Sequence, residues 1–159
     1  MRVMKFGGTS VGSAVQIRKV AGLIGNKSPK IVVLSAMSGT TNTLVEIAGT
    51  LKDGDRFRFG ELVGQLEFKY VETVNDLFGT ESCRRLAVDG MTDCFRTLWK
   101  MPQAGYTPEN EKVILAQGEL LSTLLMHLCL KEMNIESVVL PHKFQCRQHY
   151  GLYIHLFQA

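Results

Sequence analysis

The stretch Arg2-Val-Met-Lys-Phe-Gly-Gly-Thr-Ser-Val-Gly12 decides the fold that we expect, because it joins a short apolar run to two glycines and two hydroxyl residues. The apolar run predicts a strand that ends at Gly7-Gly8, where glycine permits a tight turn with positive φ. Thr9 or Ser10 is then expected to cap a helix over residues 11–24. Strand, turn and helix in this order are typical of an α/β protein.

The same turn is a candidate site for an anion. Adjacent glycines leave their N–H groups open, and the N-terminus of the following helix adds a partial positive charge. Lys5 lies beside the turn and can offer its ammonium group to a phosphate. The stretch matches neither the Walker A loop nor the dinucleotide-binding pattern, so an ordinary strand–turn–helix with a surface lysine is an equally good interpretation of these residues alone.

The composition is that of an ordinary globular domain. The chain has 159 residues, of which 45% are hydrophobic and 21% charged, and this suits one soluble domain. The net charge of +3 comes from scattered basic residues, which argues against a nucleic-acid partner. We find no apolar run of membrane-spanning length and no secretory segment, so we expect a cytoplasmic protein with no membrane partner. The four cysteines have no C-x-x-C spacing and are expected to be reduced thiols.

A second strand is predicted by the β-branched run Lys30-Ile-Val-Val-Leu-Ser35, which suits a strand covered on both faces. The loop that follows, residues 35–42, is rich in small and hydroxyl side chains. A right-handed crossover would make the two strands parallel neighbours, so this loop and the Gly7-Gly8 turn would open at the same edge of the sheet. Together they describe a polar pocket for a carboxylate or phosphate, although the same hydroxyl groups could simply cap the next helix.

The middle of the chain, residues 53–101, reads as a helical hairpin. The apolar rhythm is interrupted at Gly79-Thr80 and again near Asp89-Gly90, and a loop is expected at residues 102–105. The charged residues of the hairpin are predicted to form a solvated face: Glu61, Glu67, Lys69, Glu72, Arg84 and Arg85.

A long helix is expected to begin at Thr107-Pro108 and to end at Met133, with a second half that is apolar nearly all round and therefore buried. Glu119 would lie at the head of this buried half. Because a buried carboxylate needs a partner, Lys5 is a candidate for that partner; alternatively, Glu119 lies on a solvent stripe and pairs with Lys112 or with nothing.

Beyond this helix, residues 136–140 predict a third strand that closes a second crossover. The character of the chain changes after Pro141, where no acidic residue occurs. Cys146 and His149 do not have a recognised zinc spacing, so no metal site is expected. Residues 152–156 alternate like a half-buried strand, which is expected to cover the sheet edge poorly.

Three segments together resemble the amino-terminal part of an aspartokinase, in the amino-acid-kinase family. They are Lys5-Phe-Gly-Gly-Thr-Ser-Val11, Val32-Val-Leu-Ser-Ala36 with Gly39-Thr-Thr-Asn42, and Gly118-Glu-Leu-Leu-Ser-Thr-Leu124. The resemblance implies an α/β fold with a parallel sheet, helices on both faces and a helical hairpin insertion, present here in incomplete form. Residues 1–140 would be the amino-terminal substrate lobe, and residues 141–159 a tail that does not match the family.

The resemblance implies transfer of the γ-phosphoryl group of ATP, with Mg²⁺, to the side-chain carboxylate of L-aspartate, the first step toward the amino acids made from aspartate. It assigns residues to ATP and its phosphates (Lys5, Phe6, Gly7 and Gly8, with Lys5 catalytic) and to aspartate (Ser35, Thr41 and Glu119), and none to a metal ion. Glu119 would either orient Lys5 or hold the ammonium group of aspartate.

The family also carries a second, nucleotide-binding lobe with a glycine-rich loop followed by Ser-Asp, which this sequence lacks. We therefore expect the chain to be inactive by itself, to be the product of a truncated or frame-shifted gene, and to self-associate through surfaces that the missing lobe would cover. Two other functions remain open: a kinase of another acidic amino acid, such as glutamate or acetylglutamate, and a non-catalytic fragment that binds a partner chain or small ligand.

Overall fold

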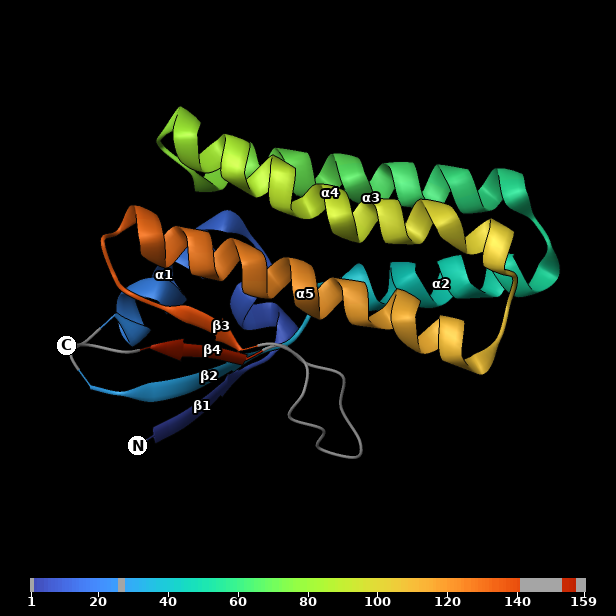
Figure 1. The fold of residues 1–159 in the computed structure, drawn as a ribbon. Coiled ribbons are helices and arrows are strands. Elements are labelled where there is room, and N and C mark those ends of the chain that lie inside the picture. Colours follow the sequence, from blue (N-terminus) through green and yellow to red (C-terminus); the bar gives the residue numbers. More distant parts are fainter. Residues whose placement is uncertain (1, 26–27, 141–152, 157–159) are drawn as a thin grey trace.

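The computed structural model describes residues 2–25, 28–140 and 153–156, and it arranges them in three layers (Figure 1). A small sheet forms the first layer, α1, α2 and α5 form the second, and the antiparallel pair α3 and α4 forms the third. The elements in chain order are β1 (Arg2–Phe6), the 3₁₀ turn η1 (Gly8–Val11), α1 (Ala14–Ile24), β2 (Lys30–Leu34), α2 (Thr40–Asp53), α3 (Arg56–Leu77), α4 (Glu81–Ala104), α5 (Pro108–Glu132), β3 (Val138–Leu140) and β4 (Tyr153–Leu156).

The sheet has the order β1-β2-β4-β3. β1 and β2 are parallel, with Lys5 opposite Val33 and Phe6 opposite Leu34, and this confirms the predicted βαβ unit. β4 is antiparallel to both β2 and β3, so the last strand makes the sheet mixed. It also pairs along Lys30–Val33 of β2, and the expectation that this tail would cover the sheet edge poorly is therefore wrong.

The helices that the structure describes cover one face of the sheet (Figure 1). Val32 and Leu34 of β2 are buried beneath them, whereas Val3 of β1 remains 64% exposed. Ile31 and Val33, which alternate with the buried pair, are only half-buried. The expected cover on both faces is thus not found among the described residues, although the sequence of β2 is apolar enough for it.

The central element is α5, which packs against α1, α2, α4 and the sheet. Its start is as predicted, because the hydroxyl oxygen of Thr107 accepts a hydrogen bond from the Asn110 N–H at 3.0 Å. By length and composition α5 is apolar enough to cross a membrane, and it is the one such helix among the described residues. The expectation that no apolar run reaches this length is therefore wrong. Because α5 is packed against other elements on several sides, its apolar composition is that of a core helix.

The predicted interruption of α4 and its predicted end are both wrong. The helix runs without a break through Asp89-Gly90, because Gly90 is a contact point between helices: a Cβ there would lie 2.9 Å from Cδ2 of Leu124 on α5. α4 also includes Pro102 in its last turn and ends at Ala104, three residues later than expected. Gly105, with φ +75°, ends the helix instead.

The start of α1 also differs from the prediction. Residues 8–11 form the 3₁₀ turn η1, so neither Thr9 nor Ser10 caps the helix. Ser13 caps it instead, and its hydroxyl oxygen accepts from the Gln16 N–H at 3.4 Å. The 3₁₀ turn thus delays the helix by three residues.

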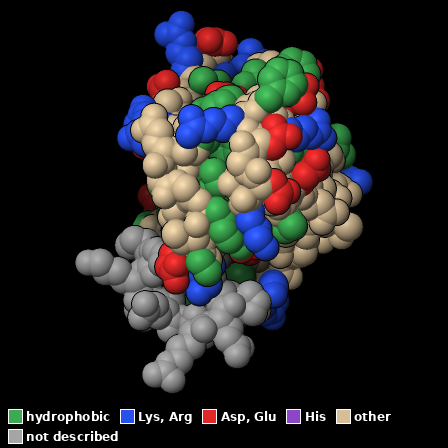
Figure 2. All heavy atoms as spheres, turned by 90° about the vertical axis from the view of Figure 1, so that its right-hand side faces the viewer, with side chains coloured by type: hydrophobic (Ala, Val, Ile, Leu, Met, Phe, Trp, Pro, Cys, Tyr) green, Lys and Arg blue, Asp and Glu red, His purple; other side chains and the backbone are tan. Residues whose placement is uncertain are grey.

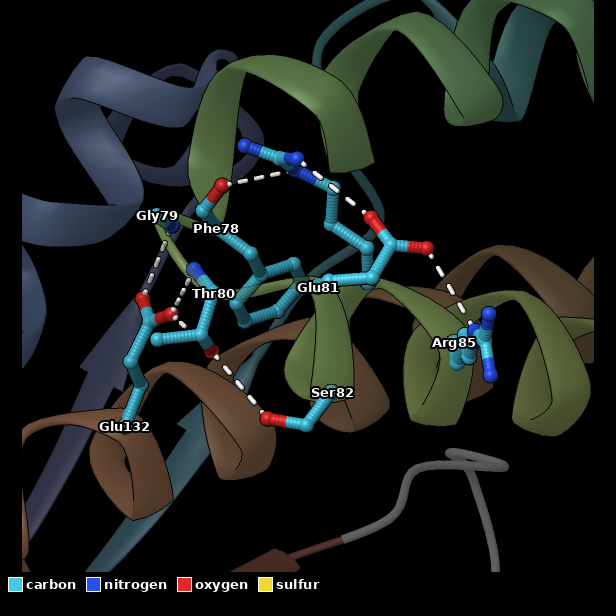
Figure 3. Close-up of polar contacts among 8 residues, drawn as sticks. Phe78, Gly79, Thr80, Glu81, Ser82, Arg85 and Glu132 are labelled. Atoms are coloured by element: carbon cyan, nitrogen blue, oxygen red, sulfur yellow. Dashed lines mark hydrogen bonds and ion pairs between the residues drawn. The ribbon is translucent and has the colours of Figure 1, made fainter.

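Charged side chains of α1 and α5 hold the turn between α3 and α4. Arg18 donates hydrogen bonds to the carbonyl oxygens of Asp76 and Leu77, at 2.6 and 2.7 Å, and so satisfies the C-terminus of α3. Glu132 accepts from the N–H and the hydroxyl of Thr80, at 2.9 and 2.8 Å, and so caps α4 from a neighbouring helix (Figure 3). The long hairpin is therefore fastened at its tip to the rest of the core.

The carboxyl of Glu132 has a lowered pKa. Burial acts to raise this pKa, but the hydrogen bonds from the hydroxyl and N–H of Thr80 and from the N–H of Gly79, with the nearby Arg18 guanidinium, together outweigh that effect. The ionised form is consequently favoured in the folded state over the unfolded state.

We predict that Glu132→Gln lowers the free energy of unfolding by about 1 kcal/mol at pH 7, because the variant caps α4 with a neutral group. A depressed carboxyl pKa contributes stability above its unfolded value and loses it as the pH falls through the folded value. The difference between wild type and variant should therefore shrink below pH 4.5, the ordinary value of the group. Urea denaturation at several pH values measures this. Glu72→Gln, on an exposed position of α3, is the control, and an equal loss in both variants would refute the capping role.

Candidate functional site

The turn after β1 and the loop after β2 lie at the same edge of the sheet, as predicted. The N–H of Ser35 donates to the carbonyl oxygen of Phe6 at 3.0 Å, which continues the parallel register past the end of both strands. The two loops therefore leave the sheet side by side.

The glycines of the first loop serve a purpose other than the one we predicted. Gly7 has φ −76°, and neither Gly7 nor Gly8 has positive φ. Gly8 is needed because the backbones approach closely: a Cβ on Gly8 would lie 2.7 Å from the carbonyl oxygen of Ala36. A Cβ on Gly12 would likewise lie 2.9 Å from the Cβ of Ser38. The two loops are thus packed directly on each other.

The third segment reaches the same point from α5. A Cβ on Gly118 would lie 2.7 Å from the Cβ of Ala36 and 3.0 Å from Cδ1 of Leu44. Gly118 therefore lets α5 cross immediately behind the loop, with Glu119 as its next residue. The three segments that carry the family resemblance thus meet at Ala36 of the second segment, and a glycine makes each of the other two approaches possible.

The predicted site residues differ in their exposure. Lys5, Gly7 and Thr41 are exposed, and the others are half-buried: Phe6, Gly8, Ser35 and Glu119. Glu119 was expected to be buried, but in the structure it is only half-buried. The structure brings the backbones of all these segments together, and the roles of their side chains remain predictions.

The N-terminus of α2 lies within this loop region. It begins after Gly39, which has φ +79° and provides no side-chain cap, so the alternative that a hydroxyl group of this loop caps the helix is not found. The hydroxyl of Thr43 instead donates back to the carbonyl oxygen of Gly39 at 3.2 Å. The first turn contains no acidic residue. The first turn, which contains Thr41, thus supplies no negative charge of its own to the positive end of this 14-residue helix.

Two residues of α3, which the sequence analysis did not assign to the site, contact the loop. The Lys69 ammonium donates to the carbonyl oxygen of Ser38 at 2.7 Å and approaches Oγ1 of Thr40 at 3.4 Å. The hydroxyl of Tyr70 lies 3.3 Å from the same Oγ1. Lys69 is half-buried, so its assignment to a solvated face is wrong. The helical period could have revealed it, because Lys69 lies three residues after the buried Leu66 and four before the buried Thr73.

Tyr70 connects this contact to α5. It is fully buried, and burial raises the pKa of its hydroxyl to about 12 despite hydrogen bonds with Thr40 and Ser122, so the group remains a neutral donor near pH 7. Ser122 in turn donates to the carbonyl oxygen of Gly118 at 3.1 Å. A polar chain therefore links Lys69 and the loop to the helix that carries Glu119.

Of the other charges predicted for the solvated face, Glu61, Glu72 and Arg85 are exposed, whereas Glu67 and Arg84 are half-buried. Figure 2 looks onto the ends of the helices, and on this face Lys, Arg, Asp and Glu side chains are interspersed with hydrophobic ones. Arg58 of α3 pairs with Glu46 of α2 at 2.9 Å and with Glu61 at 3.3 Å, and all three side chains are exposed by more than 40%. Such pairs contribute little to stability.

Within the described residues, no group of three His, Cys, Asp or Glu side chains could hold a metal ion. Cys146 and His149, considered above as metal ligands, lie outside those residues. We therefore assign no Mg²⁺ ligand to the described part of the chain.

The close contact at Ala36 leads to a prediction. Gly8→Ala should lower the free energy of unfolding by about 1–3 kcal/mol, because the new methyl group would displace the backbone of the neighbouring loop. Gly22→Ala is the matched control: it lies on an exposed position of α1 with open space around its Cβ and should stabilise the protein by about 0.5–1 kcal/mol. Urea denaturation compares the two, and a Gly8→Ala variant as stable as Gly22→Ala would contradict the contact.

Solved structures of other proteins share this fold. The chain superimposes on Escherichia coli aspartokinase III, solved in complex with lysine and aspartate, with a TM-score of 0.66 and 28% identity over 86% of this chain and 30% of that one. The same enzyme in complex with aspartate and ADP gives a TM-score of 0.56. Clostridium acetobutylicum aspartate kinase, at 19% identity and a TM-score of 0.64, shows the same fold.

Curated sequences agree. The chain is 28% identical to lysine-sensitive aspartokinase 3 of Escherichia coli over 136 residues, which are 85% of this chain and 29% of that protein. It is 33% identical to an aspartokinase of Chlamydia trachomatis over 104 residues, which are 54% of this chain and 24% of that protein. The chain thus spans less than a third of the length of these relatives. The sequence profile of the Amino acid kinase family matches residues 1–148, and the chain therefore belongs to the amino acid kinase family.

Proposed function

We propose that the chain supplies the aspartate-binding part of an aspartate kinase, an enzyme that transfers the γ-phosphoryl group of ATP to the side-chain carboxylate of L-aspartate. The observation that carries the proposal is the convergence of the three segments at Ala36, which brings Lys5, Ser35 and Glu119 to one edge of the sheet. The named relatives support it, because the Escherichia coli enzyme was solved with aspartate and with ADP.

In this proposal the loop after β2 binds the aspartate. The hydroxyl groups of Ser35 and Thr41 donate to a carboxylate, and the uncapped N-terminus of α2 adds a favourable field. Glu119 either holds the ammonium group of the substrate or orients Lys5. Longer acidic amino acids remain the alternative substrates.

Lys5 has the catalytic role in this proposal. It lies at the carboxyl end of β1, exposed and adjacent to the Gly7-Gly8 backbone, where Phe6, Gly7 and Gly8 would approach the phosphates of ATP. Phosphoryl transfer depends on alignment and charge stabilisation, and a lysine here would offset the charge of two anionic reactants. Mg²⁺ would accompany the ATP phosphates and neutralise part of their charge.

The alternative is a fragment without catalytic activity that binds a small ligand or partner chain. This alternative is supported by coverage, because the chain spans less than a third of the length of its relatives. We expect the chain to bind L-aspartate weakly and to turn over no ATP by itself. A coupled ATP-consumption assay with L-aspartate measures the second point. Formation of aspartyl phosphate would mean that the chain has a complete nucleotide site.

We predict that calorimetric titration detects L-aspartate binding, and that Thr41→Val or Glu119→Gln weakens it by about tenfold, because each removes a charge-assisted hydrogen bond. Thr92→Val is the control, since Thr92 is exposed on α4 and its hydroxyl donates to the Val88 carbonyl oxygen of the same helix. A wild-type chain that binds no aspartate, or a Thr92→Val variant weakened as much as Thr41→Val, would refute the assignment.

We further propose that the chain self-associates. β1 is an edge strand of the sheet, and Val3 is exposed by 64% on it. Unpaired strand edges and exposed apolar faces favour association, although Arg2 and Lys5 on the same strand oppose it. Light scattering at micromolar concentration should show a mass above that of one chain. A stable monomer would reject the proposal and would indicate that the free edge of β1 does not drive association.

A further inference from the structure

Lys69 is the cation of α3 that lies closest to the loop after β2. Its ammonium group donates to the carbonyl oxygen of Ser38 at 2.7 Å, a distance typical of a strong charge-assisted hydrogen bond, and lies 3.4 Å from Oγ1 of Thr40. It also stands 3.8 Å from the position of a Cβ on Gly39. The side chain therefore reaches across the turn at Ser38–Thr40.

The other restraints on this turn are local hydrogen bonds and the close approach of Ser38 to Gly12. Gly39 has φ +79°, a conformation that glycine adopts at little steric cost. Glycine is also the residue that loses most conformational freedom when the chain folds. Two backbone hydrogen bonds close the turn, from the Thr40 N–H to Met37 at 3.0 Å and from the Thr43 N–H to Gly39 at 3.2 Å. Ser38 and Gly39 themselves are exposed. A long-range contact to a rigid helix is consequently important for holding them.

The contact comes from two neighbours on one helix. Tyr70 anchors Oγ1 of Thr40 from the buried side at 3.3 Å, while Lys69 holds Ser38 from the partly exposed side. Both residues lie in the middle of the 22-residue helix α3, whose tip is fastened by Arg18 and Glu132. The hairpin is thus a stable support against which the turn is held.

We propose that Lys69 is a positioning residue of the aspartate site: by binding the Ser38 carbonyl and Thr40, it fixes the turn that carries Thr41 and the N-terminus of α2. The proposal rests on the proposed function for its ligand, but the positioning of the turn can be measured without a ligand. Lys69 is not assigned any contact with substrate.

The test combines amide hydrogen exchange with aspartate titration on the whole chain. Lys69→Met removes the ammonium group and keeps the apolar stem. We expect the amides of Thr40 and Thr43 to exchange about tenfold faster, as loss of a charge-assisted hydrogen bond predicts, while amides inside α5 are unchanged. Aspartate affinity should fall by a similar factor. Lys69→Arg, which keeps a cationic donor, should remain closer to wild type.

Lys19→Met is the matched control, because Lys19 is an exposed lysine on α1, and it should leave both measurements unchanged. Unchanged exchange at Thr40 and Thr43 in Lys69→Met would overturn the proposal. Faster exchange throughout the chain would overturn it too, since it would show general destabilisation. If Lys69→Met does not fold, Lys69→Gln is compared with wild type in the same way. A wild-type chain that binds no aspartate refutes the proposed function, whereas the ligand-free exchange still decides whether Lys69 fixes the turn.

Discussion

The rest of this structure depends on a contact between backbones at Ala36. The turn after β1 and the helix α5 both approach this residue so closely that a single Cβ, on Gly8 or on Gly118, would collide with it. Packing of this kind tolerates no added volume, because protein interiors are as dense as molecular crystals. Three segments that are far apart in the sequence are thereby held at one edge of a small sheet, and every candidate site residue lies in or next to one of them.

The helical hairpin has a larger part in this arrangement than an insertion on the surface would have. Its outer side is charged and solvated, with weak ion pairs such as Arg58–Glu46. Its inner side presents Lys69 and Tyr70 to Thr40 of the hydroxyl-rich loop. Because Arg18 and Glu132 bind the two helix ends at its tip, the hairpin can act as a fixed support for that loop.

The electrostatic character of the loop follows from the same packing. The N-terminus of α2 lacks a side-chain cap and an acidic residue in its first turn, and Lys69 lies beside it. Two sources of positive potential are thus combined at a place where the chain also offers hydroxyl groups. This combination suits an anionic group such as the carboxylate of the substrate that we propose.

Much of the fold could be predicted from the sequence because local patterns decide it. The β-branched run of β2, the interruption at Gly79-Thr80 and the Thr107 cap of α5 each act over a few residues, and the structure contains all three features. The family resemblance rests on strings of this kind as well, and the match of residues 1–148 confirms it.

The errors arose at residues whose role depends on a partner far away in the sequence. Gly90 looked like a helix break but makes room for Leu124, and Gly8 looked like a turn with positive φ but makes room for Ala36. Lys69 looked like a surface charge until the fold placed Ser38 beside it. The sequence by itself determined the elements, the buried helix and the candidate site segments, since these depend on periodicity and on local caps. Only the tertiary structure decided which side chains hold the loop and why each glycine is required, because both depend on the volume and hydrogen-bonding groups of residues far away in the chain.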